Sequence, residues 1–157
     1  MKFFEFFFYY KMISIKFIHK KDIDLCYALD SNTISLWSKK QWNNELKKEG
    51  VKVIGLLLSN LVIAICVFHV ILDEAQINFF VVDQKYRKQG FGSHLMSYLI
   101  KQCEKLKINK LILEVSHTNI TADKFYSRFD FFTVGIRRNY YKDGSDALLK
   151  EKILITK

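Results

Sequence analysis

The sequence predicts an α+β protein with a central, twisted, mixed but mostly antiparallel sheet of six to seven strands, flanked by about four helices. Three observations predict this class. Residues 53–82 contain successive apolar runs separated by turn residues, which is typical of a strand meander. Residues 92–106 have the periodicity of one helix face, and residues 111–115 are a nearly continuous apolar run, as expected of a strand covered on both faces.

The longest apolar stretch, residues 53–72, is long enough to span a membrane, but Ser59 and Asn60 stand at its centre. Polar residues there would be costly in lipid, whereas Ser-Asn makes a good turn between two strands. We therefore expect a hairpin of VKVIGLLL and LVIAICVFHVIL. A third antiparallel strand is predicted over residues 76–82, after the acidic turn at residues 73–75.

The predicted helix over residues 92–106 places its apolar residues at intervals of three and four, and its lysines fall off that face. These apolar residues are Leu95, Met96, Leu99, Ile100, Cys103 and Leu106. The other expected elements are short helices over residues 22–30 and 39–48, a helix over residues 121–129, and strands near residues 132–136 and 147–155.

The chain of 157 residues, half of them hydrophobic, has the length and composition of one domain. We expect residues 12–157 to form it. Residues 1–11 are rich in aromatic side chains, but Glu5 interrupts them and no small-residue cleavage site follows, so a secretory signal is not expected. We interpret these residues as an optional aromatic extension.

The three cysteines, Cys26, Cys66 and Cys103, are odd in number and far apart, with no C-x-x-C pair. This pattern favours buried thiols in a reducing compartment over a disulfide framework. It also gives no basis for a metal site. We therefore expect a cytoplasmic protein that binds no metal.

The net charge is +9 at pH 7, from 25 basic and 16 acidic side chains, and most of the excess lies in the second half of the chain. An anionic partner should therefore meet the second half. Nucleic acid, an anionic membrane or a phosphorylated cofactor would all fit, and net charge alone does not choose among them. A basic surface that serves only solubility would give the same net charge.

A glycine-containing loop, Arg87-Lys88-Gln89-Gly90-Phe91-Gly92, joins a predicted strand to a predicted helix. Glycines allow close approach of the backbone to a ligand, and the first amides of the following helix are unpaired and carry partial positive charge. The loop should therefore favour phosphate oxygens, although it matches neither the P-loop nor the dinucleotide pattern. For this pattern in isolation, a strand-to-helix turn that binds nothing is a comparable interpretation.

The wider context resolves this choice. The segment VVDQKYRKQGFGSHLMSYLIK, followed by LILEV and NITADKFYSRFDF, resembles the GCN5-related N-acetyltransferase (GNAT) family in order and spacing, over most of the chain. VILDEAQINFFVVD, LILEVSHTNITADKFY and IRRNYYKDGSDALL are similar to its RimI-type branch, which acetylates the N-terminal alanine of a small-subunit ribosomal protein. The resemblance implies the GNAT fold, acetyl-CoA as co-substrate and a ribosomal-protein N-terminus as partner. It implies no direct nucleic-acid or membrane contact and a monomer or weak dimer.

The same resemblance assigns the cofactor-binding residues. The backbone N–H of Val82 would bond the thioester carbonyl, while Phe80 and Val81 would pair with the pantetheine arm like an added strand. Asn119 would contact that arm as well. The pyrophosphate would be held by the loop and the start of the following helix, which comprise Arg87, Lys88, Gln89, Gly90, Phe91, Gly92 and Ser93.

Two further residues are candidates for the chemistry. Glu114 is a lone carboxylate in an apolar strand, and by resemblance it is the general base that deprotonates the α-ammonium through water. Its alternative is an outward-facing strand residue paired with a lysine. Tyr126, twelve residues further on, would by resemblance protonate the departing thiolate, although most tyrosines are packing or surface residues. For His117, a proton-relay role is less favoured than the interpretation that it takes no part in the chemistry.

The chain departs from the family pattern at several positions. Gln84 replaces a usual proline, residues 35–37 read Ser-Leu-Trp where Phe-Pro-Trp is usual, and Asp130 replaces the glycine after the predicted catalytic tyrosine. Aspartate tolerates left-handed backbone better than most residues, so we expect that last turn to form. Residues 138–141 (RNYY) are predicted to form a substrate-side loop.

Two other functions fit the sequence less closely. One is acetylation of a small amine or a lysine side chain, which peptide substrates would separate from N-terminal acetylation. The other is a basic RNA- or ribosome-binding module without catalysis, in which the basic half tracks phosphate and aromatic side chains stack on bases. Acetyl-CoA should raise the melting temperature of an acetyltransferase, whereas the module should be stabilised by RNA alone.

Overall fold

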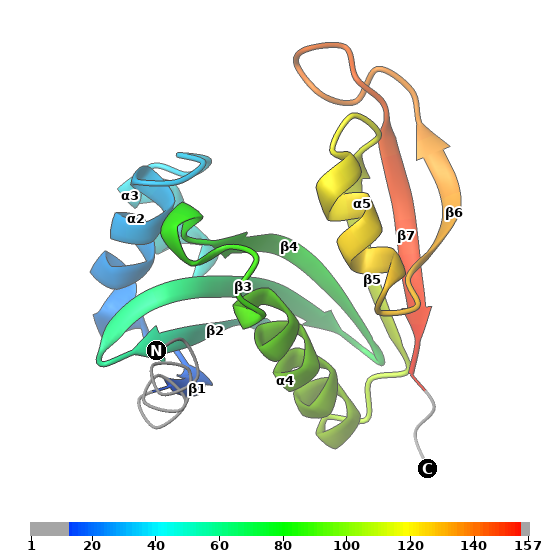
Figure 1. The fold of residues 1–157 in the computed structure, drawn as a ribbon. Coiled ribbons are helices and arrows are strands. Elements are labelled where there is room, and N and C mark those ends of the chain that lie inside the picture. Colours follow the sequence, from blue (N-terminus) through cyan, green and yellow to red (C-terminus); the bar gives the residue numbers. More distant parts are fainter. Residues whose placement is uncertain (1–12, 155–157) are drawn as a thin grey trace, which may run out of the picture. The chain divides into compact units, whose positions relative to one another are not determined.

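The computed structural model of the protein describes residues 13–154 (Figure 1). Its strands are β1 (Ile13–Phe17), β2 (Val51–Leu58), β3 (Leu61–Ile71), β4 (Glu74–Val82), β5 (Lys110–Ser116), β6 (Phe132–Arg137) and β7 (Ala147–Ile153). The helices are α2 (Ile23–Ser31), α3 (Lys39–Glu45), α4 (Phe91–Lys105) and α5 (Ile120–Ser127), with short 3-10 turns at Lys20–Asp22 and Gln84–Tyr86.

The seven strands of the described residues form one sheet in the order β1-β2-β3-β4-β5-β7-β6. Strand β4 pairs with β5 in parallel, and the pairs β1–β2, β5–β7 and β6–β7 are antiparallel. This mixed, mostly antiparallel sheet with four helices confirms the predicted fold class.

The described chain separates into two compact units. The first contains the residues up to 68 together with residues 79–101, and the second contains residues 69–78 and the residues from 102 onward. Residues 1–11, predicted to be an optional extension, lie outside the described residues, and the single domain over residues 12–157 stays a prediction.

The hairpin predicted for the long apolar stretch is confirmed by β2 and β3, which flank the turn at Ser59 and Asn60. Both turn residues have positive φ, 49° and 72°, as a two-residue turn matched to the twist of a hairpin requires. Within residues 13–154, no helix is long and apolar enough to cross a membrane. The following turn is shorter than predicted, because Glu74 and Ala75 already belong to β4.

Strand β5 differs from its prediction. Leu111, Leu113 and Val115 are buried, but Ile112 and Glu114 between them are only half-buried, so the strand is not covered on both faces. The apolar run was misleading because Ile112 adds a hydrophobic side chain to the more open face. That face is the one that carries Glu114, since side chains two residues apart on a strand point the same way.

Helix α4 buries the face that its sequence predicts. Leu95, Met96, Leu99 and Cys103 are inaccessible to solvent, in agreement with the spacing of three and four residues. All three cysteines are buried and free, as predicted. Burial raises the pKa of the Cys26 and Cys103 thiols to about 12, so neither thiol is a reactive nucleophile at neutral pH.

An apolar core in the first unit joins α2 and α3 to one face of the strands. At its centre the rings of Trp37, Trp42 and Phe79 have centroids 4.9–5.2 Å apart, in tilted or edge-to-face arrangements that aromatic rings prefer. The buried members of this core are Ile18, Ile23, Cys26, Leu29, Trp42, Leu46, Val53, Leu57, Val62, Ile65, Val67, Phe79 and Val81.

A single buried carboxylate organises the connection between α2 and α3. Asp30 has no solvent exposure and accepts hydrogen bonds from the backbone N–H groups of Leu36 and Trp37, at 2.8 and 2.9 Å, and from Trp42 Nε1 at 2.9 Å. These three donors satisfy a charge that would otherwise be expensive to bury. Ser38 then begins α3 with a capping box that includes Gln41, so the whole connection has one defined path.

We predict that Asp30→Ala lowers the free energy of unfolding by about 2–4 kcal/mol, because it leaves three donors without their charged acceptor. Urea-induced unfolding measures this loss. The matched control is Asp24→Ala on the same helix, whose exposed ion pair with Lys39 should be worth less than about 1 kcal/mol. Equal losses for the two variants would show that Asp30 does not anchor the connection.

Candidate functional site

The predicted phosphate-binding loop lies between β4 and α4 in the first unit. Lys88 and Gly90 have positive φ, 59° and 87°, a conformation that glycine adopts at little cost. A Cβ added at Gly90 would meet no atom within 4 Å, so the space beside it is open. The loop therefore offers an exposed stretch of backbone that a ligand can approach closely.

The helix that follows the loop presents its first amides without helical partners. The first hydrogen bond of α4 runs from the His94 N–H to the Gly90 carbonyl, at 3.0 Å. The N–H groups of Phe91, Gly92 and Ser93 come before it, and such amides, together with the helix dipole, favour an anion. The Phe91 ring is buried and packs edge-to-face on Tyr86, with centroids 6.1 Å apart, which fixes the start of the helix.

Two side-chain contacts fold the loop onto its own backbone. Arg87 Nε donates to the carbonyl of Val82 at 3.0 Å, and Gln89 Nε2 donates to the carbonyl of Lys85 at 3.0 Å. Arg87, Lys88 and Gln89 are all exposed. The loop thus combines a defined backbone path with two positive charges at the surface.

Side chains at the end of β4 point alternately to the two faces of the sheet. The side chain of Val81 is buried in the first unit's core, together with Phe79. Phe80 and Val82 are half-buried on the other face. Any contact of Val81 with a ligand would therefore be made by its main chain, as the predicted strand-like pairing requires.

Glu114 lies in the second unit, on β5, with its side chain 18% exposed. Its Oε1 is 3.1 Å from Nη1 of Arg137 on β6. The Tyr140 hydroxyl also donates to this carboxylate, and that hydrogen bond, with the negative charge of Glu114, raises the pKa of Tyr140. The alternative predicted for Glu114, an outward residue paired with a lysine, is wrong in its partner, because the described cation is an arginine.

Arg137 and Tyr140 are site residues that the sequence did not single out individually. The Arg137 guanidinium carbon lies 5.4 Å from the centroid of the Tyr140 ring, so the two contact each other as well as Glu114. The sequence predicts residues 138–141 as a loop, but it gives no functional signal for Arg137, which ends strand β6. Its contact with β5 spans an intervening strand, β7, and no local pattern shows such an approach.

Asn119 and Tyr126 are both carried by α5 in the second unit. Asn119 is its N-cap, with Oδ1 accepting from the Ala122 N–H at 3.1 Å. The Tyr126 side chain is buried, and its ring packs edge-to-face on Phe131 and Phe125, with centroids 5.7 and 5.4 Å away. The helix ends in a turn at Asp130, whose φ of 61° confirms that aspartate accepts the left-handed conformation here.

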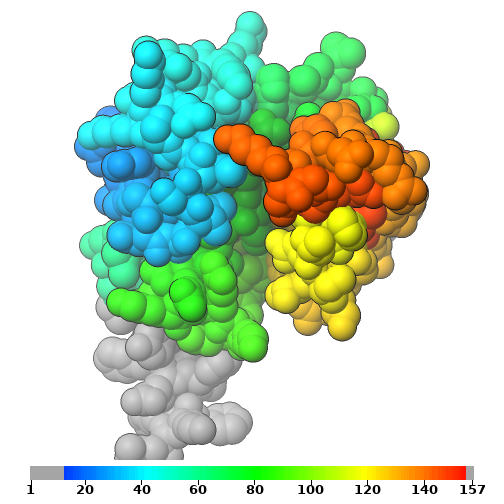
Figure 2. Space-filling model, turned by 90° about the horizontal axis from the view of Figure 1, so that it is seen from above, coloured from blue at the N-terminus to red at the C-terminus, as the bar shows by residue number. Residues whose placement is uncertain are grey.

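The loop between β6 and β7 is exposed, and it appears as an orange projection in Figure 2. Asp146 closes it by accepting from the Asn139 N–H at 2.9 Å and from Arg138 Nη1 at 2.7 Å, and these bonds lower the pKa of Asp146. His117 Nδ1 accepts from the Asp146 N–H at 3.1 Å. That ring nitrogen already has a structural partner, which favours the interpretation without a proton relay.

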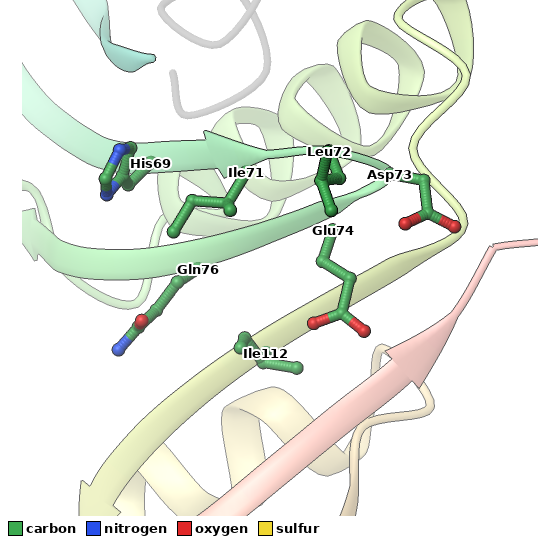
Figure 3. Close-up of a pocket in the computed structure, with 7 residues that line it drawn as sticks. All are labelled: His69, Ile71, Leu72, Asp73, Glu74, Gln76 and Ile112. Carbon is green, nitrogen blue, oxygen red and sulfur yellow. The ribbon is translucent and has the colours of Figure 1, made fainter. Parts of the chain in front are cut away.

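A surface cavity of about 330 Å³ lies elsewhere in the second unit, and Figure 3 shows the side chains around it. It is lined by His69, Ile71, Leu72, Asp73, Glu74, Gln76 and Ile112, none of which is a predicted site residue. Its carboxylates are already engaged, since Glu74 pairs with Lys110 at 2.7 Å and Asp73 accepts from Asn109 at 2.7 Å. No group of three or more potential metal ligands occurs within residues 13–154.

Comparison with known proteins identifies the family. Residues 20–131, well over half of the chain, match the model of the acetyltransferase (GNAT) family. The chain belongs to this family. The resemblance inferred from the glycine loop and the segments after it is thereby confirmed, and so is the expectation that the protein is an acyltransferase.

Two relatives and one solved structure show which branch of the family is similar. The [ribosomal protein bS18]-alanine N-acetyltransferase of Escherichia coli K12 is 30% identical over 133 residues, covering 83% of this chain and 88% of the relative. The enzyme of that name from Haemophilus ducreyi is 34% identical over 113 residues, covering 69% and 76%. The crystal structure of the E. coli ribosomal-protein-S18-alanine N-acetyltransferase superposes with a TM-score of 0.85, at 30% identity, over 91% of this chain and 94% of that one.

The loop geometry predicts the effect of a charge at its tip. Gly90→Asp should lower affinity for CoA at least tenfold, because a carboxylate would face the phosphate oxygens that the amides and basic side chains favour. Gly90→Asn is the matched control, since asparagine also accepts positive φ and has the same shape without the charge. Isothermal titration calorimetry on the folded variants makes the comparison. Equal affinities for wild type and Gly90→Asp would exclude this loop as the phosphate site.

Proposed function

We propose that the protein transfers the acetyl group of acetyl-CoA to the α-amino group of an N-terminal alanine, and that its substrate is ribosomal protein bS18. The observation that carries this proposal is the similarity over 83% of the chain to an enzyme named for that reaction. A cytoplasmic location fits this substrate and the three free, buried thiols.

The glycine loop would hold the diphosphate part of CoA. The first-turn amides of α4 supply oriented donors, and Arg87 and Lys88 supply full charges at an exposed position. The main chain at the end of β4 would then bind the pantetheine arm in the manner of an added strand, with the Val82 N–H directed at the thioester carbonyl. In that position the N–H would stabilise the negative charge that develops on the carbonyl oxygen.

Glu114 would remove a proton from the α-ammonium, through a water molecule, so that the neutral amine can attack. A carboxylate has about four lone-pair sites, and Arg137 and Tyr140 engage only part of them. A water or an ammonium group can therefore still be hydrogen-bonded by Glu114. Arg137 and Tyr140 hold the carboxylate in one orientation, which is the condition for an effective general base.

Tyr126 would complete the transfer. When the new bond between nitrogen and the acetyl carbon has formed, the bond from that carbon to sulfur breaks and leaves a thiolate. Tyrosine in general stays protonated at neutral pH and can give this thiolate its proton. The ring of Tyr126 is buried on α5 and packs on Phe125 and Phe131.

The proposal is tested by acetyl-CoA turnover with four peptides that begin with alanine, serine, methionine or a blocked amino group and share a lysine further on. We expect the alanine peptide to be used most efficiently and the blocked peptide not at all. Turnover of the blocked peptide would point to lysine acetylation instead. No turnover of any peptide, combined with stabilisation by RNA but not by acetyl-CoA, would favour the RNA-binding module.

Glu114→Gln should lower kcat/KM for the alanine peptide by about 10²–10⁴, because the amide keeps the shape but cannot accept the proton. The deficit should shrink above about pH 8, where a free α-amine is neutral without assistance. A pH-rate series measures this. Glu151→Gln, on the neighbouring strand β7, is the control and should stay close to wild type. A deficit independent of pH would contradict the role as base.

Tyr126→Phe keeps the ring and removes only the hydroxyl, so the loss of activity should not be relieved at high pH. It should instead shrink with an acetyl thioester whose thiol is more acidic, because such a leaving group needs no proton. Steady-state rates with the two thioesters give the ratio, and Tyr98→Phe on α4 is the control. If both thioesters show the same deficit, Tyr126 does not act as the acid.

A further inference from the structure

The second unit contains a lysine that the proposed reaction does not use. Lys150, in the middle of β7, is only 4% exposed, although lysine is almost never fully buried without a partner. Its Nζ lies 2.7 Å from Oδ1 of Asp123 and 3.5 Å from Oγ of Ser127, both on α5. The Oδ1 atom of Asp123 is buried and makes no hydrogen bond within the described residues, although the Asp123 side chain as a whole is 32% exposed, and the ammonium group compensates its charge.

The two partners of Lys150, Asp123 and Ser127, lie one turn apart on α5 and on either side of Tyr126 in the sequence. Tyr126 and Ser127 follow Asp123 by three and four residues, the spacings that bring side chains close to that of Asp123 on a helix. Tyr126, between them in sequence, has its side chain buried. The ammonium of Lys150 therefore contacts α5 next to the proposed acid.

Lys150 also lies on the strand that pairs with the one carrying the proposed base. Lys150 is opposite Leu113 of β5, and the preceding residue of β7, Leu149, is opposite Glu114, so the side chains of Lys150 and Glu114 point to opposite faces of the sheet. One ion pair thus connects the helix that carries Tyr126 to the strand that pairs with the one carrying Glu114. Figure 1 shows α5 lying along β5 and β7, so the contact joins adjacent elements.

An ion pair of this kind is a poor stabiliser, because the cost of removing charges from water can exceed the attraction between them. Hydrophobic side chains of similar volume would hold a helix on a sheet at least as firmly. Apolar packing tolerates small rotations and shifts of a helix, however, whereas a contact between two charged atoms at 2.7 Å does not. Fixing the register of neighbouring elements is the best-attested use of such pairs.

Helix α5 has particular need of such a contact. It has only eight residues, and isolated helices of this length are marginal in water. Its exposed residues include Ile120, and its C-terminal end is held by aromatic contacts of Phe125 with Phe129, at 5.2 Å between centroids. The ion pair is the charged contact that fixes the middle of the helix to β7.

We propose that Lys150 and Asp123 are positioning residues, which set the rotation and axial position of α5 and thereby place Tyr126 and Asn119 for acetyl transfer. This inference rests on the proposed function of Tyr126. The pair does not touch the reacting atoms. It acts through the helix, so its removal should affect the step in which the thiolate is protonated more than the binding of either substrate.

The test replaces both charges together, in the variant Lys150→Met/Asp123→Leu, so that no unpaired charge is left in the interior. We expect this variant to fold and to melt within a few degrees of wild type. Its kcat should fall about 10- to 100-fold, with KM for acetyl-CoA unchanged, because small misplacements of a catalytic group cost that much. The deficit should shrink with the more acidic thioester, as for Tyr126→Phe. Adding Tyr126→Phe should cause little further loss.

A matched control on the same strand is Lys152→Met, which removes the more exposed pair of Lys152 with Asp130, at 3.4 Å. It should leave kcat unchanged. A second measurement does not depend on activity: hydrogen exchange of the α5 amides should accelerate at least tenfold in the charge-free variant, while β5 and β7 keep their protection. Because hydrogen exchange needs no substrate, this measurement tests the positioning of α5 whatever the substrate is.

Three results would overturn the inference. An unchanged kcat in the folded charge-free variant would show that the pair does not position the acid. Losses that multiply fully with Tyr126→Phe would show that the two act independently. Failure of the charge-free variant to fold would make the pair a requirement of folding. If wild type is inactive on every N-terminal peptide but exchange in α5 responds as expected, the proposed function fails and the positioning of the helix stands.

Discussion

Charges taken out of water need compensation, and in this protein the compensating groups come from other segments of the chain. Asp30 is satisfied by two amides and an indole N–H from the residues that follow its helix. Glu114 on β5 is met by Arg137 and Tyr140 from beyond an intervening strand. Lys150 on β7 is met by Asp123 on α5. Asp30 and Lys150 are buried, and because an unpaired buried charge is strongly unfavourable, their contacts restrict where the partner segments can lie.

The two halves of the proposed chemistry are built in different ways. The phosphate-binding part uses backbone amides at the start of α4 and a glycine at positive φ, which are properties of a short continuous stretch. The surroundings of Glu114 depend on Arg137 of β6 and Tyr140 of the following loop, which meet Glu114 only when β5, β7 and β6 pair in the observed register. The first part is therefore encoded locally, and the second is a product of the tertiary structure.

This difference explains what the sequence could predict. Apolar residues recur every two residues in a half-buried strand and every three to four in a helix, because burial on one face imposes that period. These patterns predict the hairpin, α4 and the strands to within a few residues. Gly90 and the loop charges were visible as a short motif. Arg137 was not, since its approach to Glu114 depends on the register of three strands. The apolar run predicts a fully covered β5 because Ile112 is apolar, and an isoleucine on an open face cannot be recognised from the run alone.

Charge also distinguishes the tyrosines near the proposed base from the proposed acid. Tyr140 is near the proposed base, but its hydroxyl donates to Glu114, and the carboxylate raises the pKa of Tyr140. Loss of that proton would place a phenolate against a carboxylate, so Tyr140 is held as a donor to Glu114 rather than as a source of protons for a thiolate. Burial and the charge of Glu114 raise the pKa of Tyr141 as well. The proposed acid, Tyr126, lies outside this cluster, as a buried side chain on α5, the helix whose Asp123 pairs with Lys150.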